Sequence, residues 1–321
     1  MKGRHSIEIR NNRSVFKFNL EYNISVIKGD SATGKTTLID MISEYQRFGE
    51  SSGITLKCDK KCIVLDSYNW NVILSTTKDS IVFIEEGNPF VKSKEFAAAI
   101  KGTDNYYVIV TRENLFELPI SVEAIYGIKG RKYFQLKRTY NSLYRIYPEN
   151  MPVQMPSLII TEDSGSGFDF WKSVAKDHNY KCFTSKGNAN LLNLLKNNED
   201  QSILVIADGA AFGAYMEMLY DYRIQKNREV YAYLPESFEW LILSSDVFGD
   251  KEIKQILLSP YDYFDSKKYF SREQFYTALL ISKTKDTYLK YSKRKLNKAY
   301  LEGKTKTMIL KNVPSKLFGN K

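Results

Sequence analysis

Cysteine and histidine are scarce in this chain of 321 residues, which has three of the first and two of the second. Cys58, Cys62 and Cys182 are too few for the disulfide framework of a small secreted protein. Three residues separate Cys58 from Cys62, but no second cysteine or histidine pair completes a zinc site. We therefore interpret the cysteines, and the isolated His5 and His178, as structural or incidental.

Long apolar runs are also absent, so the sequence predicts no transmembrane helix. Residues 1–6 lack the apolar core of a signal peptide. The remaining composition, with 43% hydrophobic and 26% charged residues, is typical of a globular protein. These features predict a cytoplasmic protein that has no membrane partner and is long enough for two domains.

One segment, residues 29–36, reads G-x-x-x-x-G-K-T. Residues 24–27 before it are apolar and β-prone, and residues 37–42 after it have the apolar spacing of a helix. A strand, a glycine loop and a helix in this order predict a phosphate-binding loop, whereas a glycine-rich turn with a surface lysine would not require these flanks. The residues expected to bind the nucleotide are Gly29, Asp30, Ser31, Ala32, Thr33, Gly34, Lys35, Thr36 and Thr37.

The chemistry of this loop follows from its residue types. Glycines let the backbone wrap an anion so that successive amides point at its oxygens, and the helix that follows adds its unpaired N–H groups. Lys35 is expected to reach the β and γ phosphates as a catalytic residue, and the hydroxyl of Thr36 is expected to hold Mg²⁺.

Residues 80–86 place two acids after a run of four apolar residues. This pattern predicts a buried parallel strand that delivers carboxylates at its C-terminal end, where ligands bind in open α/β sheets. We assign Glu85 to the metal and Glu86 to the attacking water, although the two roles are interchangeable at this point. The alternative is a buried strand that ends in solvated acids.

A third apolar strand, residues 107–110, is followed by Thr111–Asn114, which either sense the γ phosphate or form a plain loop. Further on, residues 124–128 and 132–136 are typical of a hairpin that turns at residues 129–131.

Residues 5–140 resemble the ASCE division of P-loop ATPases, on the strength of residues 29–36 and 81–86. The resemblance implies a P-loop NTPase sheet that binds ATP and Mg²⁺. The usual Walker B aspartate is Glu85 here, and no L-S-G-G-Q signature of ABC enzymes occurs. An N-K-x-D segment is missing too, which counts against a guanine-specific GTPase.

Prolines at positions 148–156 mark the expected boundary to a second domain. Beyond it, residues 157–161, 181–184, 202–207 and 229–234 have strand character and alternate with helical patterns, which predicts a second parallel sheet. Glu162 and Asp208 follow two of these strands, so both acids are candidate metal ligands at the carboxyl edge of that sheet.

Residues 157–245 resemble a Toprim domain, found in topoisomerases, primases and OLD-type nucleases. The resemblance implies that Glu162 and Asp208 bind Mg²⁺ for phosphodiester chemistry. Ala210 occupies the place of the second aspartate of the family's D-x-D motif, which weakens any two-metal site. The acids that could substitute for it are Asp163, Glu236 and Glu239.

The net charge of +10 belongs to the C-terminal segment. Residues 281–321 contain 12 Lys or Arg against 2 Asp or Glu, which leaves 35 of each kind over residues 1–280. Residues 288–300 are expected to form a basic amphipathic helix. Such a segment either binds DNA or RNA through its phosphates or is a solvated helical face.

The sequence thus predicts an α/β protein with three parts. They are a P-loop NTPase domain at 1–148, a Toprim-like α/β domain at 157–258 and a basic helical segment at 259–321. Its predicted function is ATP hydrolysis that gates a nucleic-acid-directed domain, as in OLD-family ATPase–nucleases. The alternatives are a nucleotide-dependent switch without nuclease activity and a P-loop kinase. A homo-oligomer and a partner protein both remain open.

Overall fold

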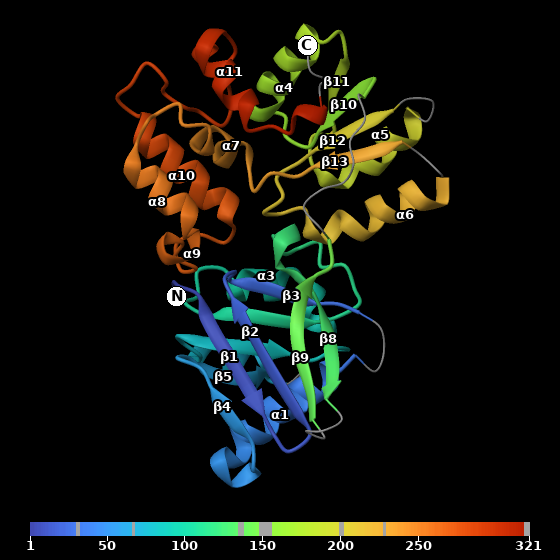
Figure 1. The fold of residues 1–321 in the computed structure, drawn as a ribbon, viewed down its shortest axis with the longest axis vertical. Coiled ribbons are helices and arrows are strands. Elements are labelled where there is room, and N and C mark those ends of the chain that lie inside the picture. The colour runs from blue at the N-terminus through green and yellow to red at the C-terminus, as the bar shows by residue number, and fades with distance from the viewer. Residues whose placement is uncertain are drawn as a thin grey trace. The chain divides into compact units, whose positions relative to one another are not determined.

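A computed structural model of the chain divides it into two compact units (Figure 1). Unit 1 comprises Met1–Tyr147 and Ser259–Ser271, and unit 2 comprises Pro148–Leu258 and Arg272–Lys321. The architecture is mixed α/β, as predicted, with a large, mostly parallel sheet in unit 1 and a smaller parallel sheet in unit 2. The structure describes residues 1–29, 33–65, 68–133, 138–147, 156–198, 202–226 and 229–317.

The sheet of unit 1 combines an antiparallel part with a parallel part. Residues 5–20 form its first hairpin, and Asn11 holds the turn by accepting hydrogen bonds from the amides of Arg13 and Ser14, both at 2.8 Å. The strands lie in the order β4 (Thr55–Lys57), β1 (His5–Arg10), β2 (Ser14–Leu20), β9 (Arg138–Arg145), β8 (Ile125–Tyr133), β3 (Ile24–Ile27), β7 (Tyr106–Val110), β6 (Ser80–Ile84) and β5 (Lys61–Leu65).

The parallel strands β3, β6 and β7 are buried along their whole length because helices cover both faces of the sheet. On β6, Ile81 and Phe83 belong to the core beneath α1 (Lys35–Phe48). Val82 and Ile84 point to the opposite face, whose core includes residues of α2 (Trp70–Thr76) and α3 (Lys94–Ile100). Because these strands run parallel, their carboxyl ends lie at the same edge of the sheet.

The predicted turn at residues 129–131 is wrong. Strand β8 runs straight through these residues to Tyr133 and pairs with β9 from Tyr126↔Arg145 to Tyr133↔Arg138. Gly130 is tolerated inside the strand because the side chain of Asn141 fills the space beside it, 2.8 Å from where a Cβ would stand. Residues 134–137, between the two strands, lie outside the described residues.

Residues 259–271 return to unit 1 although they follow most of unit 2 in sequence. The segment begins with α9 (Pro260–Tyr263), whose Tyr261 carbonyl accepts a 2.8 Å hydrogen bond from the amide of Gly3. Asn23 donates to the carbonyl of Phe270 at 3.0 Å.

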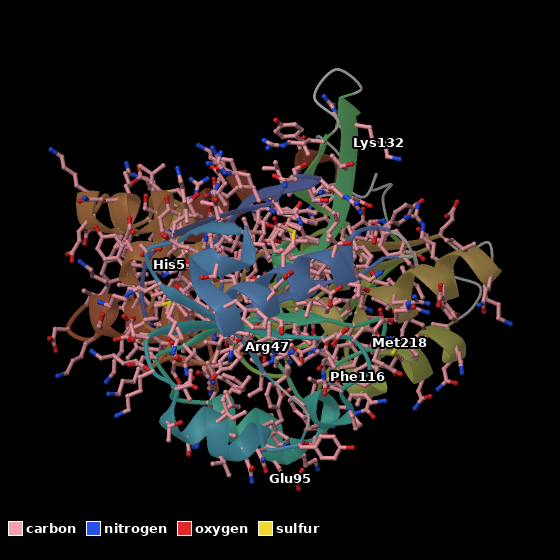
Figure 2. The ribbon with its side chains drawn as sticks, turned by 90° about the horizontal axis from the view of Figure 1, so that it is seen from below. His5, Arg47, Glu95, Phe116, Lys132 and Met218 are labelled. Carbon is pink, nitrogen blue, oxygen red and sulfur yellow. The ribbon has the colours of Figure 1, made fainter. Side chains whose placement is uncertain are left out.

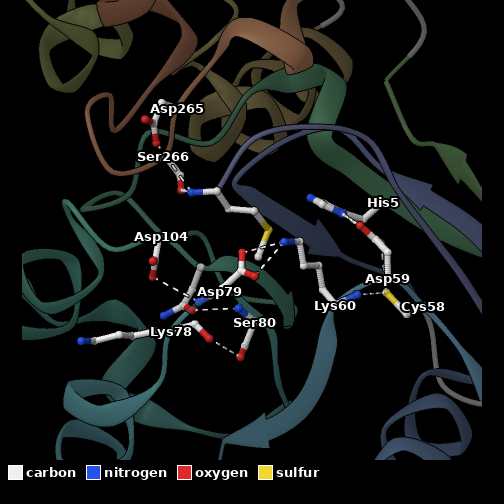
Figure 3. A network of polar contacts seen from close by, with 12 residues as sticks. His5, Cys58, Asp59, Lys60, Lys78, Asp79, Ser80, Asp104, Asp265 and Ser266 are labelled. Atoms are coloured by element: carbon white, nitrogen blue, oxygen red, sulfur yellow. Dashed lines mark hydrogen bonds and ion pairs between the residues drawn. The ribbon is translucent and has the colours of Figure 1, made fainter.

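A network of polar contacts lies at the β5 side of unit 1 (Figure 3). Buried His5 contacts Asp59 through Nδ1 at 2.9 Å, and Lys60 forms an ion pair with Asp79 at 2.7 Å. Cys58 lies beside Asp59, with its Sγ 3.7 Å from the carboxylate. These contacts join the β4–β5 connection to the strands on either side.

Unit 2 contains the second parallel sheet that the sequence predicts. All three strand pairs are parallel, and the central strands β10 and β12 are fully buried. The strand order is β11 (Lys181–Thr184), β10 (Leu158–Thr161), β12 (Ile203–Ile206) and β13 (Val230–Tyr233). The helices of this unit are α4 (Ser166–Asp177), α5 (Leu191–Asn197), α6 (Met216–Lys226), α7 (Phe238–Ser244), α8 (Lys251–Leu258), α10 (Arg272–Thr284) and α11 (Gly303–Lys311).

The basic helix predicted over residues 288–300 is not formed. Helix α10 ends at Thr284, and the following chain is irregular up to a 3₁₀ turn at Lys298–Tyr300. Tyr291 explains the difference, because its buried hydroxyl bonds Ser166 at 2.5 Å and Glu239 at 2.8 Å, which holds this segment against α4 and α7. None of the described helices has the length and apolar character needed to span a bilayer.

Candidate functional sites at two sheet edges

The glycine loop of unit 1 lies between β3 and α1. The loop leaves β3 after Ile27, and α1 begins at Lys35. Gly29 and Gly34 have φ angles of +134° and +96°, which L-residues with a side chain rarely adopt. The backbone therefore requires glycine at both ends of the loop. The predicted residues Asp30, Ser31 and Ala32 lie outside the described residues.

Lys35 is the first residue of α1 and is only 5% exposed. Its ammonium donates to the carbonyl oxygen of Gly29 at 2.5 Å, so the side chain turns back over the loop. Thr36 and Thr37 are exposed on the first turn. Gly34 caps α1 without a side-chain acceptor, which leaves the first amides of the helix without a side-chain cap.

Glu85 and Glu86 follow β6 at the same edge and are both exposed. Glu86 forms a 2.7 Å ion pair with Arg112, which follows the neighbouring strand β7. On the other side of β7, Lys28 follows β3 and donates to Asn114 at 2.7 Å. The carboxyl ends of β3, β7 and β6 thus carry charged side chains beside the glycine loop.

In unit 2, the two acids predicted from sequence line one pocket. Glu162 directly follows β10, and Asp208 follows the neighbouring strand β12 by two residues. The pocket has a volume of about 300 Å³. Its lining is Glu162, Asp163, Ser164, Lys186, Gly187, Asn188, Asp208, Ala211, Glu273 and Lys293.

Burial and crowded negative charge disfavour the ionised carboxylates of this pocket. Burial, followed by the charges of Glu273 and Asp163, raises the pKa of Glu162 to about 7. Burial also raises the pKa of Asp208 well above its usual value, with Glu273 and Glu239 adding to the shift. The ammonium of Lys293 opposes both shifts, because it stabilises the ionised forms.

The sequence did not predict the contributions of Glu273 and Lys293. Glu273 lies in the first turn of α10, and Lys293 lies in the irregular segment that follows this helix. The two form an ion pair at the pocket, and Lys293 is 43% exposed. No motif marks them, because Glu273 is 65 positions from Asp208 and reaches it only through the tertiary fold.

Ala210 is 2% exposed and does not line the pocket. Its amide donates to the carbonyl of Glu236 at 3.0 Å, which keeps the chain after β12 against the chain after β13. A carboxylate side chain at position 210 would therefore be attached to a buried part of the backbone that does not line the pocket.

The three acids considered as replacements have different surroundings. Asp163 lines the pocket, but its carboxylate accepts from the amides of Gly165 and Gly167 at 2.8 and 2.7 Å at the start of α4. Glu236 forms a 3.4 Å ion pair with Arg272. Glu239 is 1% exposed and accepts from the hydroxyl of Tyr291. Of the three, only Asp163 lines the pocket.

Within the described residues, no group of three or more His, Cys, Asp and Glu side chains is arranged to hold a metal ion. A cation shared by Glu162, Asp208 and Glu273 would therefore require these side chains to move together.

Compared with known protein families, with curated proteins and with solved structures, the chain matches none of them. Its function must therefore be argued from the geometry of the two sites.

Proposed function

We propose that this chain is an ATP-binding protein, an ATPase, whose nucleotide state controls a nucleic-acid-directed Toprim-like unit. The observation that carries the proposal is the loop between β3 and α1. Its terminal glycines have positive φ angles, its lysine opens the helix, and the helix has no side-chain cap. An anion at the start of α1 would meet the backbone amides of the first helical turn and a lysine at the same point.

The residues of unit 1 suit a nucleoside triphosphate with its Mg²⁺. The exposed hydroxyl of Thr36 and the exposed carboxylate of Glu85 are oxygen donors of the kind that Mg²⁺ prefers. When bound, the ion would neutralise charge on the β and γ phosphates. Lys35 would exchange the carbonyl of Gly29 for phosphate oxygens, a stronger, charge-assisted interaction.

The ion pair with Arg112 distinguishes Glu86 from Glu85, whose roles toward the metal and the attacking water were interchangeable from sequence. Glu86 is held by a guanidinium at the end of β7, which orients its carboxylate, whereas Glu85 carries no such pair in the described residues. We therefore retain Glu85 for the metal and Glu86 for the attacking water. We also propose Arg112, from the predicted segment Thr111–Asn114, as a residue that senses the γ phosphate.

The test is ATP turnover by the purified chain, with and without DNA. Lys35→Ala should reduce turnover at least a hundredfold, because the lysine would no longer stabilise charge on the transferred phosphoryl group. Lys57→Ala, which removes an exposed lysine at the end of β4, is the matched control and should leave turnover unchanged.

The same assay separates the alternatives. ATP bound tightly without turnover would indicate a switch. Phosphate recovered on an acceptor molecule would indicate a kinase. Equal turnover in the wild type and Lys35→Ala would contradict a catalytic role for the loop.

A second candidate function is cation-dependent phosphodiester cleavage by unit 2. It is favoured by the convergence of Glu162, Asp208 and Glu273 on one pocket beside Lys293. Carboxylate oxygens suit a hard divalent cation, and the repulsion that raises the pKa of Glu162 and Asp208 is what a cation would relieve. When bound, Mg²⁺ would polarise the phosphodiester, while the ammonium of Lys293 would attract its charge.

We expect the chain to nick supercoiled plasmid in the presence of Mg²⁺ or Mn²⁺. Glu162→Gln and Glu273→Gln should each abolish nicking, since each removes one of the few carboxylates in the pocket. Glu252→Gln, at an exposed surface ion pair with Lys283, is the control and should nick normally. If the wild type binds these cations but never nicks DNA, unit 2 is a binding module without nuclease activity.

A further inference from the structure

Strands β8 and β9 form a long antiparallel ribbon whose outer part has one charged face, and β2 pairs with β9 along Thr139–Asn141. Cross-strand partners share a face of a sheet, so the register Lys129↔Ser142, Arg131↔Tyr140 and Tyr133↔Arg138 defines this face. Figure 2 labels Lys132 near the end of β8, where the strand stands out at the top of the view. We call this surface the ribbon face: Lys129, Arg131, Arg138, Tyr140, Ser142 and Tyr144.

The opposite face of the ribbon packs inward over most of its length. Ile128 is part of the core beneath α1, and Leu143 packs against the same core. Asn141 is 8% exposed and donates to the carbonyl of Val15 at 3.3 Å. Because side chains alternate along a strand, this packing holds the ribbon face outward.

The ribbon is the densest positive stretch of unit 1. Residues 125–147 contain six Lys or Arg and no Asp or Glu, although residues 1–280 are balanced as a whole. Among the described residues, no carboxylate forms an ion pair with Lys129, Arg131 or Arg138. The cations are therefore not neutralised by their described neighbours.

Two tyrosines alternate with these cations and are solvent-accessible. Tyr140 is 37% exposed and Tyr144 is 51% exposed. The ring of Tyr144 lies across Gly127, where a Cβ would stand 2.5 Å from the ring. Glycine at this position therefore allows the ring to lie over the strand instead of standing away from it.

We infer that the ribbon face binds single-stranded nucleic acid. Phosphates would pair with Lys129, Arg131 and Arg138, and unstacked bases would stack on Tyr140 and Tyr144. A duplex would offer its phosphates but not the faces of its bases, and an acidic protein or an anionic membrane would leave the rings without a planar partner. The combination of cations and exposed rings on one strand face thus favours a single strand.

The ribbon face is distinct from the surface that the sequence predicted for nucleic acid. That prediction rested on residues 281–321, in which Lys283, Lys293 and Lys306 are engaged in ion pairs with acids of unit 2. The ribbon face also needs no nucleotide to form. The opposite face of the ribbon adjoins the glycine loop, because a Cβ on Gly34 would lie 3.9 Å from Oδ1 of Asn141.

The experiment measures binding of a fluorescently labelled oligothymidylate of 20 nucleotides by anisotropy, using the full chain without ATP or divalent cations. The double variant Lys129→Gln/Arg131→Gln should bind at least tenfold more weakly. The slope of its log binding constant against log salt concentration should be shallower by about 1.4, since each phosphate contact on a single strand contributes about 0.7. Tyr144→Leu should weaken binding about tenfold with an unchanged salt slope, because stacking is lost and charge is kept.

Lys132→Gln is the matched control, since Lys132 is exposed on the opposite face of the same strand. It should bind within twofold of the wild type. Circular dichroism and thermal unfolding establish that each variant is folded. Lys35→Ala should still bind the oligonucleotide, so a failed ATPase proposal and a failed ribbon proposal give different results.

Several outcomes would overturn the inference. One is a loss of oligonucleotide affinity in Lys132→Gln equal to that of the double variant, which would indicate a diffuse charge effect. Another is a loss confined to Arg294→Gln/Lys295→Gln, which would assign binding to the C-terminal segment. Tighter binding of a 20-base-pair duplex than of the single strand, or of phosphatidylserine vesicles with the same variant pattern, would identify a different partner.

Discussion

At the residue scale, the two sites differ in how their charges are stabilised. Lys35 has its ammonium on a carbonyl oxygen of its own loop. Glu162 and Asp208 instead face other carboxylates, and Lys293 is the cation that opposes their repulsion. The first site thus holds its cation on a backbone oxygen, whereas the second accumulates negative charge that a cation or protons would relieve.

Glu162 should make the stability of the chain depend on pH. Its pKa is about 7 in the folded state against an ordinary 4.5, so the folded protein binds this proton more tightly than the unfolded chain does. The contribution is fully present below pH 4.5 and is lost as the pH rises through 7, by roughly 3 kcal/mol in total. Denaturant unfolding in EDTA between pH 5 and 8 measures it.

In Glu162→Gln this loss should disappear, because glutamine does not titrate, and the variant should be more stable than the wild type at pH 8. Glu229→Gln, an exposed change in the same unit, should keep the wild-type dependence. A parallel pH dependence in Glu162→Gln and the wild type would show that Glu162 titrates normally.

At the element scale, strand length decided what the hairpin could do. The sequence suggested a turn at residues 129–131 because glycine between basic residues is typical of one, but the backbone continues as strand through Gly130. The longer strands bring Arg131 opposite Tyr140 and place both on the exposed ribbon face. A turn at 129–131 would have left no such face.

Helix α10 illustrates the same point in unit 2. Its helical character is ordinary, and nothing in its sequence indicates that Glu273 in its first turn lines the pocket of Glu162 and Asp208. Packing between α10 and α7 brings the carboxylate there.

At the scale of the whole molecule, the chain returns to its first unit after building most of the second. Residues 259–271 bond to Gly3 and Asn23, so unit 1 is closed by a segment distant in sequence. This return predicts that the stability of unit 1 depends on residues near the C-terminal end of the chain.

Phe264→Ala should test this dependence. Phe264 is 1% exposed within the returning segment, and its truncation should cost unit 1 about 3–5 kcal/mol through lost burial and a cavity. Hydrogen exchange followed by mass spectrometry should show faster exchange in β3 and β7 of unit 1, with β10 and β12 of unit 2 little affected.

Phe275→Ala, on α10 in unit 2, is the matched truncation and should give the reverse pattern. Equal acceleration of exchange in all four strands by either variant would mean that the chain opens as one cooperative body.

The sequence by itself determined the features that depend on local pattern. Residues 24–36 specify strand, glycine loop and helix, because apolar periodicity and glycines with positive φ act over a few residues. The strands that precede Glu85, Glu162 and Asp208 were predicted for the same reason, since a buried parallel strand is a continuous apolar run.

The tertiary structure alone decided which side chains meet. It brought Glu273 and Lys293 to the pocket, kept Ala210 out of it, and held residues 288–300 in an irregular path through the hydroxyl of Tyr291. These outcomes depend on contacts between residues far apart in the chain, whose free energy no local pattern encodes. The ribbon face belongs here as well, because strand register, and not composition, sets which cations stand beside which rings.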